Sequence, residues 1–311
     1  EEKYDIIIMN RDVSAVSQKA LRAIFDDTNN VSIRFFNVSR FEKQFENLFL
    51  RGHFALETYF RLLLPNIMEG YKKVLYLDSD LVVTADIAEL FKENINGYLL
   101  AACHDADTAG LYNGYEPAKK DYMDNVLKIE RPYQYFQAGV ILFNLDEFRK
   151  KYTVEEMLKF AASYEWQLLD QDVLNYLAQD SYKPVDMKWN VMTDWNRIRI
   201  AKIISRAPKY LQDEYQKAHA APNIIHYAGP DKPWHQPYSD YAEVFWGYAR
   251  KTAYYEVLIQ RLCSRTMQDE LAFKKHFSWM NFAKKMANPF FPPKSQRRET
   301  LKKVLRKIGV L

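Results

Sequence analysis

The chain has 311 residues and a formal charge of +4, which is the sum of two unlike parts. From Lys274 to the end there are eleven basic residues and one acidic residue, a net of +10, while the rest of the chain carries −6. A general nucleic-acid-binding protein needs basic charge across its folded body, so this distribution excludes that class. The basic end alone is suited to an anionic surface.

The composition predicts a folded protein with a large apolar core. Apolar residues make up 48% of the chain and aromatic residues 15%, which excludes a disordered protein. Cys103 and Cys263 form no CxxC motif, so we expect free thiols and a reducing, cytoplasmic compartment. No run of about 18 apolar residues occurs, so no segment is expected to span a membrane.

Strand and helix patterns alternate through the first half of the chain. Apolar or alternating runs typical of strands occur at residues 4–9, 31–38, 74–77, 98–103 and 138–145. Helical patterns lie between them, beginning at the capping residue Ser14 and near residues 41–50 and 58–68. This alternation predicts an α/β domain with a mostly parallel sheet, whose ligands bind at the carboxyl ends of the strands.

The second half is predicted to be mainly helical. Two helices are expected between residues 153 and 179, then a loop-rich stretch to Trp234, then helices at 238–262 and 268–287. The final segment is an amphipathic basic helix, with an apolar face formed by Leu301, Val304, Leu305 and Ile308. This face suits peripheral contact with an anionic membrane. Packing of the same face on the body or on another subunit is the alternative.

The most informative motif is Asp78-Ser79-Asp80, which follows an apolar strand. Residues two apart on a strand point to the same side, so both carboxylates are aimed at one point. Hard divalent cations such as Mg²⁺ or Mn²⁺ bind such oxygens and are often completed by substrate phosphates. A polar turn after the strand is the simpler alternative, because Asp and Ser are common in turns.

A second candidate region is the stretch 223–235, in which a short apolar strand leads to His226. Imidazole is a suitable third ligand for Mn²⁺, and Gly229 lets the backbone approach a phosphate closely. Lys232 then supplies a positive charge to that phosphate. Taken alone, His226 is equally explained as a hydrogen-bonded core residue, so its value comes from occurring together with the aspartate pair.

Two further motifs carry polar groups at the ends of predicted elements. Asp170-Gln171-Asp172 begins a helix, where aspartate is favoured as a cap and where a polar cluster facing a sugar is the functional reading. In the run 136–144, small residues open a strand and Gln137 precedes them. The simpler interpretation of that run is a buried strand with a polar end.

The four motifs together resemble glycosyltransferase family 8. LDSD, FQAGVILFNL, DQDVLN and HYAGPDKPW occur in that order within residues 58–237, and the nearest likeness is to bacterial lipooligosaccharide galactosyl- and glucosyltransferases. The resemblance implies a GT-A fold, a UDP-hexose donor, Mn²⁺ and retention of anomeric configuration. It implies a catalytic domain over residues 1–237 and a helical, basic C-terminal extension over 238–311.

The resemblance also implies roles for individual residues. Asp78, Asp80 and His226 would bind the metal, with Ser79 between the aspartates, and Gly229 and Lys232 would hold the diphosphate. Arg61 would reach the donor sugar, and Asp105 would face both sugars. Asp170 would hold donor hydroxyls, Gln171 would lie on the sugar face opposite the leaving group, and His53 would lie near the acceptor. Gln137 stands where the nearest relatives have Asn, so its sugar contact is expected to differ.

The resemblance further implies an additional strand and helix. In family 8 a first strand and helix precede the segment that matches residues 4–38, and the strand ends in residues that grip uridine. We therefore expect about 30 more residues upstream, the length of one βα unit.

The sequence thus predicts a retaining, metal-dependent transfer of a hexose from UDP-sugar to a glycan or glycoprotein acceptor. Galactose is favoured over glucose by resemblance alone. Because Gln171 is a poor nucleophile, we expect front-face attack rather than a covalent glycosyl-enzyme. The alternatives are a metal-dependent nucleotidyltransferase and a catalytically silent relative that binds sugar nucleotides. The expected location is the cytoplasm, with peripheral attachment to the inner face of the membrane.

Overall fold

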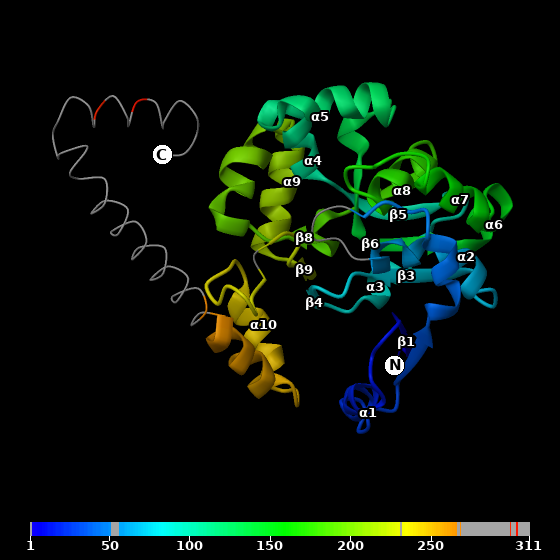
Figure 1. Ribbon diagram of the computed structural model, residues 1–311, viewed down its shortest axis with the longest axis vertical. Helices are drawn as coiled ribbons and strands as arrows, with labels where there is room; N and C mark the ends of the chain where they lie inside the picture. The colour runs from blue at the N-terminus through cyan, green and yellow to red at the C-terminus, as the bar shows by residue number, and fades with distance from the viewer. Residues whose placement is uncertain are drawn as a thin grey trace. The chain divides into compact units, whose positions relative to one another are not determined.

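The computed structural model describes residues 2–50, 56–230 and 232–265, together with the single residues 268, 299 and 303. The contacts within the chain divide it into two compact units, Glu1–Ala253 and Tyr254–Leu311. The first unit contains every strand and helix named below (Figure 1). In the second unit, residues 255–265 are helical.

Nine strands form three small sheets in the described part of the chain. The strands are β1 Tyr4–Asn10, β2 Val31–Asn37, β3 Lys73–Leu77, β4 Leu81–Val83, β5 Leu100–His104, β6 Phe136–Asn144, β7 Tyr182–Val185, β8 Val191–Met192 and β9 Ile224–His226. Their orders are β1-β2, β3-β6-β5-β7 and β4-β9-β8. The five strands predicted in the first half and the short strand leading to His226 are confirmed.

The prediction of a mostly parallel sheet is wrong, because two of the three sheets combine parallel and antiparallel pairs. β1 with β2, β5 with β7 and β8 with β9 are parallel pairs. β6 runs antiparallel to both of its neighbours, β3 and β5, and β4 runs antiparallel to β9. The long excursion between β5 and β6 brings the chain back to the same end of the sheet that it left, where Phe136 pairs with His104, so β6 runs in the reverse direction. Strand direction is therefore set by the connection and not by the strand's own residues.

Ten α-helices accompany these strands among the described residues of the first unit. They are α1 Ala15–Ala23, α2 Leu64–Ile67, α3 Ala88–Phe91, α4 Ala106–Gly110, α5 Pro117–Asp121, α6 Leu145–Lys151, α7 Val154–Ala161, α8 Asp170–Ala178, α9 Lys209–Ala220 and α10 Ala242–Ala249. Ser14 caps α1 as predicted, by accepting a hydrogen bond from the Ser17 backbone N–H. The two helices expected between residues 153 and 179 are α7 and α8.

Three helix predictions need correction. The helix expected near residues 41–50 is a 3₁₀ segment, Ser39–Phe45, in which Phe45 is the buried residue. The stretch described as loop-rich contains α9, whose buried Leu211, Tyr215 and Ala218 recur at helical spacing. The helix expected over 238–262 is divided by turns at residues 250–254, between α10 and the helical residues 255–265.

β6 is the centre of the core. Its first eight residues are all buried, which agrees with the continuous apolar run that marked it as a strand. Ile141 and Phe143 belong to the main apolar cluster, which includes residues of α7 and α8, and Val140 belongs to a second cluster with residues of α9. β6 is thus covered on both faces, and its first residues lie beside the polar groups described next.

Candidate functional site

The aspartate pair and the histidine are brought together by strand ends. β3 ends at Leu77, so Asp78 and Asp80 follow it directly. β9 ends in His226, and its pairing with β4 sets His226 opposite Leu81. The Tyr227 backbone N–H donates to the Asp80 carbonyl at 2.9 Å, which continues this pairing past the strand. Two segments far apart in the sequence are thereby fixed side by side.

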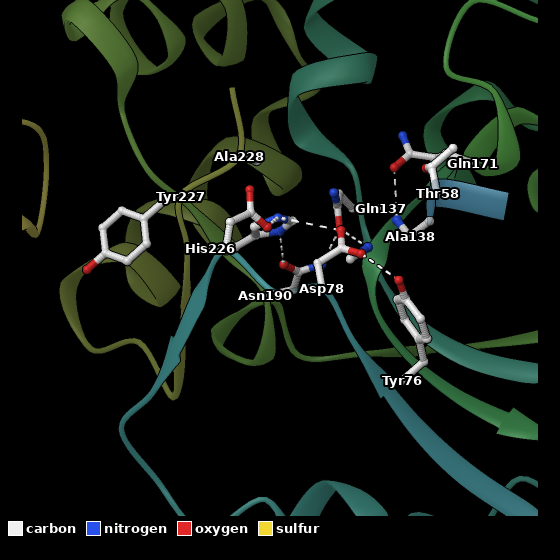
Figure 2. Close-up of polar contacts among 12 residues, drawn as sticks. Thr58, Tyr76, Asp78, Gln137, Ala138, Gln171, Asn190, His226, Tyr227 and Ala228 are labelled. Atoms are coloured by element: carbon white, nitrogen blue, oxygen red, sulfur yellow. Dashed lines mark hydrogen bonds and ion pairs between the residues drawn. The ribbon is translucent and has the colours of Figure 1, made fainter. Parts of the chain in front are cut away.

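These three side chains form a candidate metal site. One ligand atom from each of Asp78, Asp80 and His226 lies within 4.8 Å of the other two. His226 Nε2 is 3.2 Å from Asp80 Oδ1 and 3.7 Å from Asp78 Oδ2. Figure 2 shows the Asp78 and His226 side chains turned toward one another. Two carboxylates and an imidazole suit Mn²⁺, and a cation relieves the repulsion between the carboxylates.

Gly139 makes room for this cluster. A Cβ at this position would lie 2.2 Å from His226 Cε1, 2.7 Å from His226 Nδ1 and 2.9 Å from Asp78 Oδ2. Real Cβ atoms do not approach other atoms so closely, so glycine is required here for steric reasons. The small residues that open β6 in the sequence thus have a specific purpose, which is to seat the imidazole ring against the strand.

Lys232 lies at the same corner but binds protein groups. Its Nζ donates to Asp80 Oδ2 and, at 2.6 Å, to the Tyr227 carbonyl. Burial raises the pKa of Asp80, but His226 and Lys232 outweigh it and hold that pKa well below its usual range. Gly229 has a positive φ of 108°, a conformation in which glycine is favoured. The loop therefore returns its lysine to the second aspartate.

Arg61 joins the aspartate motif to α8. The guanidinium is buried, and its Nη2 donates to Asp78 Oδ1 at 2.7 Å while its Nε lies 2.9 Å from Asp170 Oδ2. It also donates to the Ala138 carbonyl and lies 4.3 Å from the Tyr76 ring centroid. Burial opposes its charge, but Asp170 and Asp78 raise the pKa of Arg61. A permanent cation thus bridges two carboxylates inside the protein.

Asp170 lies beside this cation in a buried position. Thr58 Oγ1 donates to its Oδ1, as Arg61 approaches its Oδ2. Burial nevertheless raises the pKa of the Asp170 carboxyl to about 6, against the opposing effect of Arg61. Asp170 therefore ionises close to neutral pH, which is typical of functional carboxyls.

Gln171 and Asp105 are joined by a direct hydrogen bond. Gln171 Nε2 donates to Asp105 Oδ2 at 3.1 Å, and Gln171 Oε1 accepts from the Ala138 backbone N–H at 2.9 Å, a contact drawn in Figure 2. Asp105 also caps α4 by accepting from the Thr108 backbone N–H at 2.8 Å. Burial, and then Asp107, raise the pKa of Asp105. The two hydrogen bonds of the Gln171 side chain, to Asp105 and from the Ala138 N–H, fix the orientation of its amide.

Asp172 is turned away from these groups. It is fully buried and accepts hydrogen bonds from Tyr122 Oη at 2.6 Å, Tyr135 Oη at 2.6 Å and the Leu168 backbone N–H at 2.8 Å. Leu169, the residue just before α8, has a φ of 48°, which is strained for a residue with a side chain. The Asp172 carboxylate thus holds the turn that presents Asp170 and Gln171.

Most of the predicted residues converge. Arg61, Asp78, Asp170 and Ala138 are connected by the Arg61 contacts, and Ala138 connects in turn to Gln171. Ser79 is exposed between the two aspartates. His53 lies outside the described residues, as does the predicted amphipathic segment apart from Lys303.

Three residues of the site were missed in the sequence: Thr58, Tyr76 and Asn190. Tyr76 Oη donates to Asp78 Oδ1 at 3.0 Å, and Asn190 Oδ1 lies 2.9 Å from His226 Nδ1. Tyr76 had a signal, because it stands two residues before Asp78 on the same face of the strand. Thr58 stands three residues before Arg61 on the 3₁₀ helix Leu56–Leu63, and Asn190 follows the 3₁₀ turn Met187–Trp189, so both lie outside the four motifs.

Comparison with known proteins supports a common ancestry. Residues 1–237 match the model of glycosyl transferase family 8. The chain is 28% identical over 260 residues to glycosyltransferase GlyF of Streptococcus pneumoniae, which covers 83% of this chain and 56% of GlyF. The structure of WbbM, a bifunctional glycosyltransferase, superposes with a TM-score of 0.75 at 28% identity, over 83% of this chain and 46% of WbbM.

An active-site mutant of the galactosyltransferase LgtC superposes with a TM-score of 0.64 at 24% identity, over 79% of this chain and 85% of LgtC. At this level of identity the likeness shows a shared fold. The predicted GT-A fold is thereby confirmed. The chain spans about half the length of GlyF and of WbbM, so their complete activities describe longer proteins.

Proposed function

The chain belongs to glycosyltransferase family 8, and from that premise we propose that it transfers a hexose from UDP-hexose to a glycan acceptor with retention of anomeric configuration. The observation that carries the proposal is the convergence of Asp78, Asp80 and His226 at the end of β3. A bound Mn²⁺ at these residues would neutralise charge developing on the departing diphosphate. Mg²⁺ has the same preference for oxygen ligands and is the alternative ion.

The protein's own cation would serve the diphosphate as well. Lys232 Nζ donates hydrogen bonds to Asp80 Oδ2 and to the Tyr227 carbonyl, so it would lie close to a phosphate bound near Asp80. With a divalent cation at Asp80, the Lys232 ammonium would be able to pair with a phosphate oxygen as a point charge. Gly229 has a positive φ and no side chain, so a phosphate would be able to approach the backbone of this loop closely.

The donor sugar would lie against a polar surface, here called the sugar wall, formed by Arg61, Asp105, Asp170 and Gln171. Arg61 and Thr58 hold the Asp170 carboxylate, which is suited to accept hydrogen bonds from sugar hydroxyls. The Gln171 amide is held by Asp105 and by the Ala138 N–H. We assign these four residues to positioning the sugar and its acceptor.

Retention is best explained by front-face attack. Gln171 is an amide, and the nearby Asp172 carboxylate is engaged by three hydrogen bonds away from Asp105 and Asp170. In the proposed step the acceptor hydroxyl oxygen bonds to the anomeric carbon on the face from which UDP leaves. The bond from that carbon to the phosphate oxygen breaks, and the hydroxyl proton passes to the departing diphosphate.

Galactose is the proposed hexose, with glucose as the alternative. The chain shares its fold with the galactosyltransferase LgtC, which has been crystallised with donor and acceptor sugar analogs, and this likeness favours galactose as the proposed hexose. For the acceptor we propose a glycan of a bacterial surface glycoconjugate or glycoprotein. A screen of UDP-sugars with Mn²⁺, followed by a screen of sugar acceptors, tests both assignments.

The product separates this proposal from the other candidates. A glycosyltransferase releases UDP, whereas a nucleotidyltransferase releases pyrophosphate from a nucleoside triphosphate. Release of pyrophosphate would refute hexose transfer. Binding of UDP-sugars without turnover, over a full range of acceptors, would identify a silent relative instead.

We also propose peripheral attachment to an anionic membrane from the cytoplasmic side, through the basic segment from Lys274 onward. The support is its charge of +10 against −6 for the remainder of the chain. Among the described residues, no helix combines the length and apolar character needed to cross a bilayer. Pelleting with anionic liposomes should fall when the chain ends at Pro289, and unchanged pelleting would refute the attachment.

A further inference from the structure

A series of buried amides runs from the backbone of β6 to the imidazole of His226. It begins at the Gly139 backbone N–H, which donates to Gln137 Oε1. A backbone N–H can only donate a hydrogen bond, so the atom of Gln137 that faces it must be the carbonyl oxygen. This single contact fixes which way round the Gln137 amide stands.

The same oxygen of Gln137 also fixes Asn190. Asn190 Nδ2 donates to Gln137 Oε1, and both side chains are buried. Because an acceptor oxygen can bind only a donor, the Asn190 atom nearest to it must be the amide nitrogen. The Asn190 carbonyl oxygen then points the other way and lies 2.9 Å from His226 Nδ1 (Figure 2).

The last contact sets the proton on the histidine. The Asn190 oxygen can only accept, so His226 Nδ1 must carry a hydrogen. In the neutral imidazole the other nitrogen, Nε2, is then without one, and it lies 3.2 Å from Asp80 Oδ1 and 3.7 Å from Asp78 Oδ2, where a cation would meet all three atoms. An imidazole binds a metal through such an unprotonated nitrogen.

We propose that Gln137 and Asn190 are positioning residues that hold His226 in the Nδ1–H tautomer and so prepare Nε2 as a metal ligand. This inference deepens the proposed function and rests on its metal site. It gives Gln137 a different task from a sugar contact. The longer side chain of glutamine lets one oxygen meet both the Gly139 N–H and Asn190.

The tautomer is measurable in the metal-free protein without any substitution. Histidine labelled with ¹⁵N distinguishes the two neutral tautomers by NMR, and a His226→Gln sample identifies the resonances of His226. We expect the neutral His226 ring to carry its hydrogen on Nδ1. A hydrogen on Nε2 of the neutral ring would overturn the proposal.

Substitutions test whether the amides cause this state. Asn190→Leu and Gln137→Leu each interrupt the series, so we expect a mixed tautomer and a Mn²⁺ dissociation constant raised by about 10- to 100-fold, measured by electron paramagnetic resonance of free Mn²⁺. Gln137→Glu keeps an acceptor oxygen for both donors, so it should retain the Nδ1–H tautomer. Wild-type Mn²⁺ affinity in folded Asn190→Leu protein would overturn the proposal.

Asn144→Leu is the matched control. Asn144 also lies on β6, donates to the Ile95 carbonyl at 3.0 Å and caps α6, but at the far end of the strand. Its loss should lower stability and leave both the tautomer and the Mn²⁺ affinity unchanged. An equal loss of Mn²⁺ affinity in Asn144→Leu would show a merely structural effect and contradict the assignment.

The two levels of inference fail in different ways. If the wild-type protein binds no Mn²⁺ while His226 carries its hydrogen on Nδ1, the proposed metal site is wrong and the amide series stands. If Mn²⁺ binds tightly while the hydrogen lies on Nε2, the metal site stands and the assigned task of Gln137 and Asn190 is wrong.

Discussion

Two neighbouring regions of the site differ in how their charged and polar groups are paired. In the metal corner, formed by Asp78, Asp80 and His226, oxygen and nitrogen atoms converge within 4.8 Å. In the sugar wall, formed by Arg61, Asp105, Asp170 and Gln171, the groups bind one another, as Arg61 binds Asp170 and Gln171 binds Asp105.

The difference indicates two kinds of task. In the metal corner Arg61 binds Asp78 Oδ1 and Lys232 binds Asp80 Oδ2, while Asp78 Oδ2 and Asp80 Oδ1 face His226 Nε2, and these are the atoms that we propose bind a cation. The groups of the sugar wall are already paired with one another, so they would offer the proposed donor sugar a rigid, preorganised polar surface. Substitutions should therefore abolish metal binding in the first region and change orientation or ionisation in the second.

The largest effect is expected from Asp80→Ala. It removes one of the three ligands and the partner of Lys232, so metal-dependent transfer should fall by at least about 100-fold. UDP release at a series of Mn²⁺ concentrations measures the loss. Asp213→Ala is the control, because Asp213 is exposed on α9 and forms a surface ion pair with Lys209. Full activity of Asp80→Ala with the metal chelated would disprove the metal site.

Gly139→Ala should affect the same corner through packing. The added methyl would meet the His226 ring at 2.2 Å, so the ring must leave its position and Mn²⁺ affinity should fall. Overpacking of this kind costs about 1–3 kcal/mol of stability, measurable by denaturant unfolding. Gly70→Ala is the control, since a Cβ there meets nothing within 4 Å. Unchanged affinity in Gly139→Ala would contradict the described geometry.

Asp170→Asn should change the pH dependence of the sugar wall. The pKa of Asp170 is raised to about 6, so kcat/KM of the wild type should rise with a midpoint near pH 6 if the carboxylate is the active form. The asparagine variant should lose that rise and most of its activity. If kcat/KM of Asp170→Asn still rises with a midpoint near pH 6, the rise belongs to another group.

The sign for stability is the reverse of the sign for activity. Between the unfolded pKa of 3.8 and about 6, the folded protein retains a proton on Asp170 that the unfolded chain has released. The stabilising contribution of Asp170 is therefore complete below the lower value and is lost as the pH rises through about 6. Asp170→Asn should remove this part of the pH dependence of unfolding.

The smallest effect is expected from Tyr135→Phe, which removes one donor to Asp172 at the turn before Asp170. A hydrogen bond of about 1 kcal/mol predicts a fall in kcat of about 3- to 10-fold with little change in Mn²⁺ affinity. Tyr152→Phe removes a comparable bond to the Leu177 carbonyl near the end of α8 and should leave kcat unchanged. Equal kcat in both variants would remove Asp172 from the positioning of the wall.

Local patterns predicted much of the fold. The continuous apolar run of β6 and the Ser14 cap of α1 were visible because they depend on residues a few positions apart. The reversed direction of β6 was not, because it depends on the path of the chain between β5 and β6.

The candidate site divides in the same way. Asp78 and Asp80 could be identified from the sequence alone, since a strand aims alternate residues at one point. Their relation to His226 was suggested by co-occurring motifs, and only the pairing of β4 with β9 brings the two segments together. The contacts of Arg61, which bridges Asp78 and Asp170, also required the tertiary structure.

By itself the sequence determined the strand that carries the aspartate pair, the polar motifs and the division into an acidic body and a basic end, because these are properties of neighbouring residues and composition. The tertiary structure alone decided that Lys232 meets Asp80, that Asp172 faces the core and that Asn190 orients His226. A hydrogen bond between distant segments has no local periodicity, so its partners are chosen by how the sheets and loops pack.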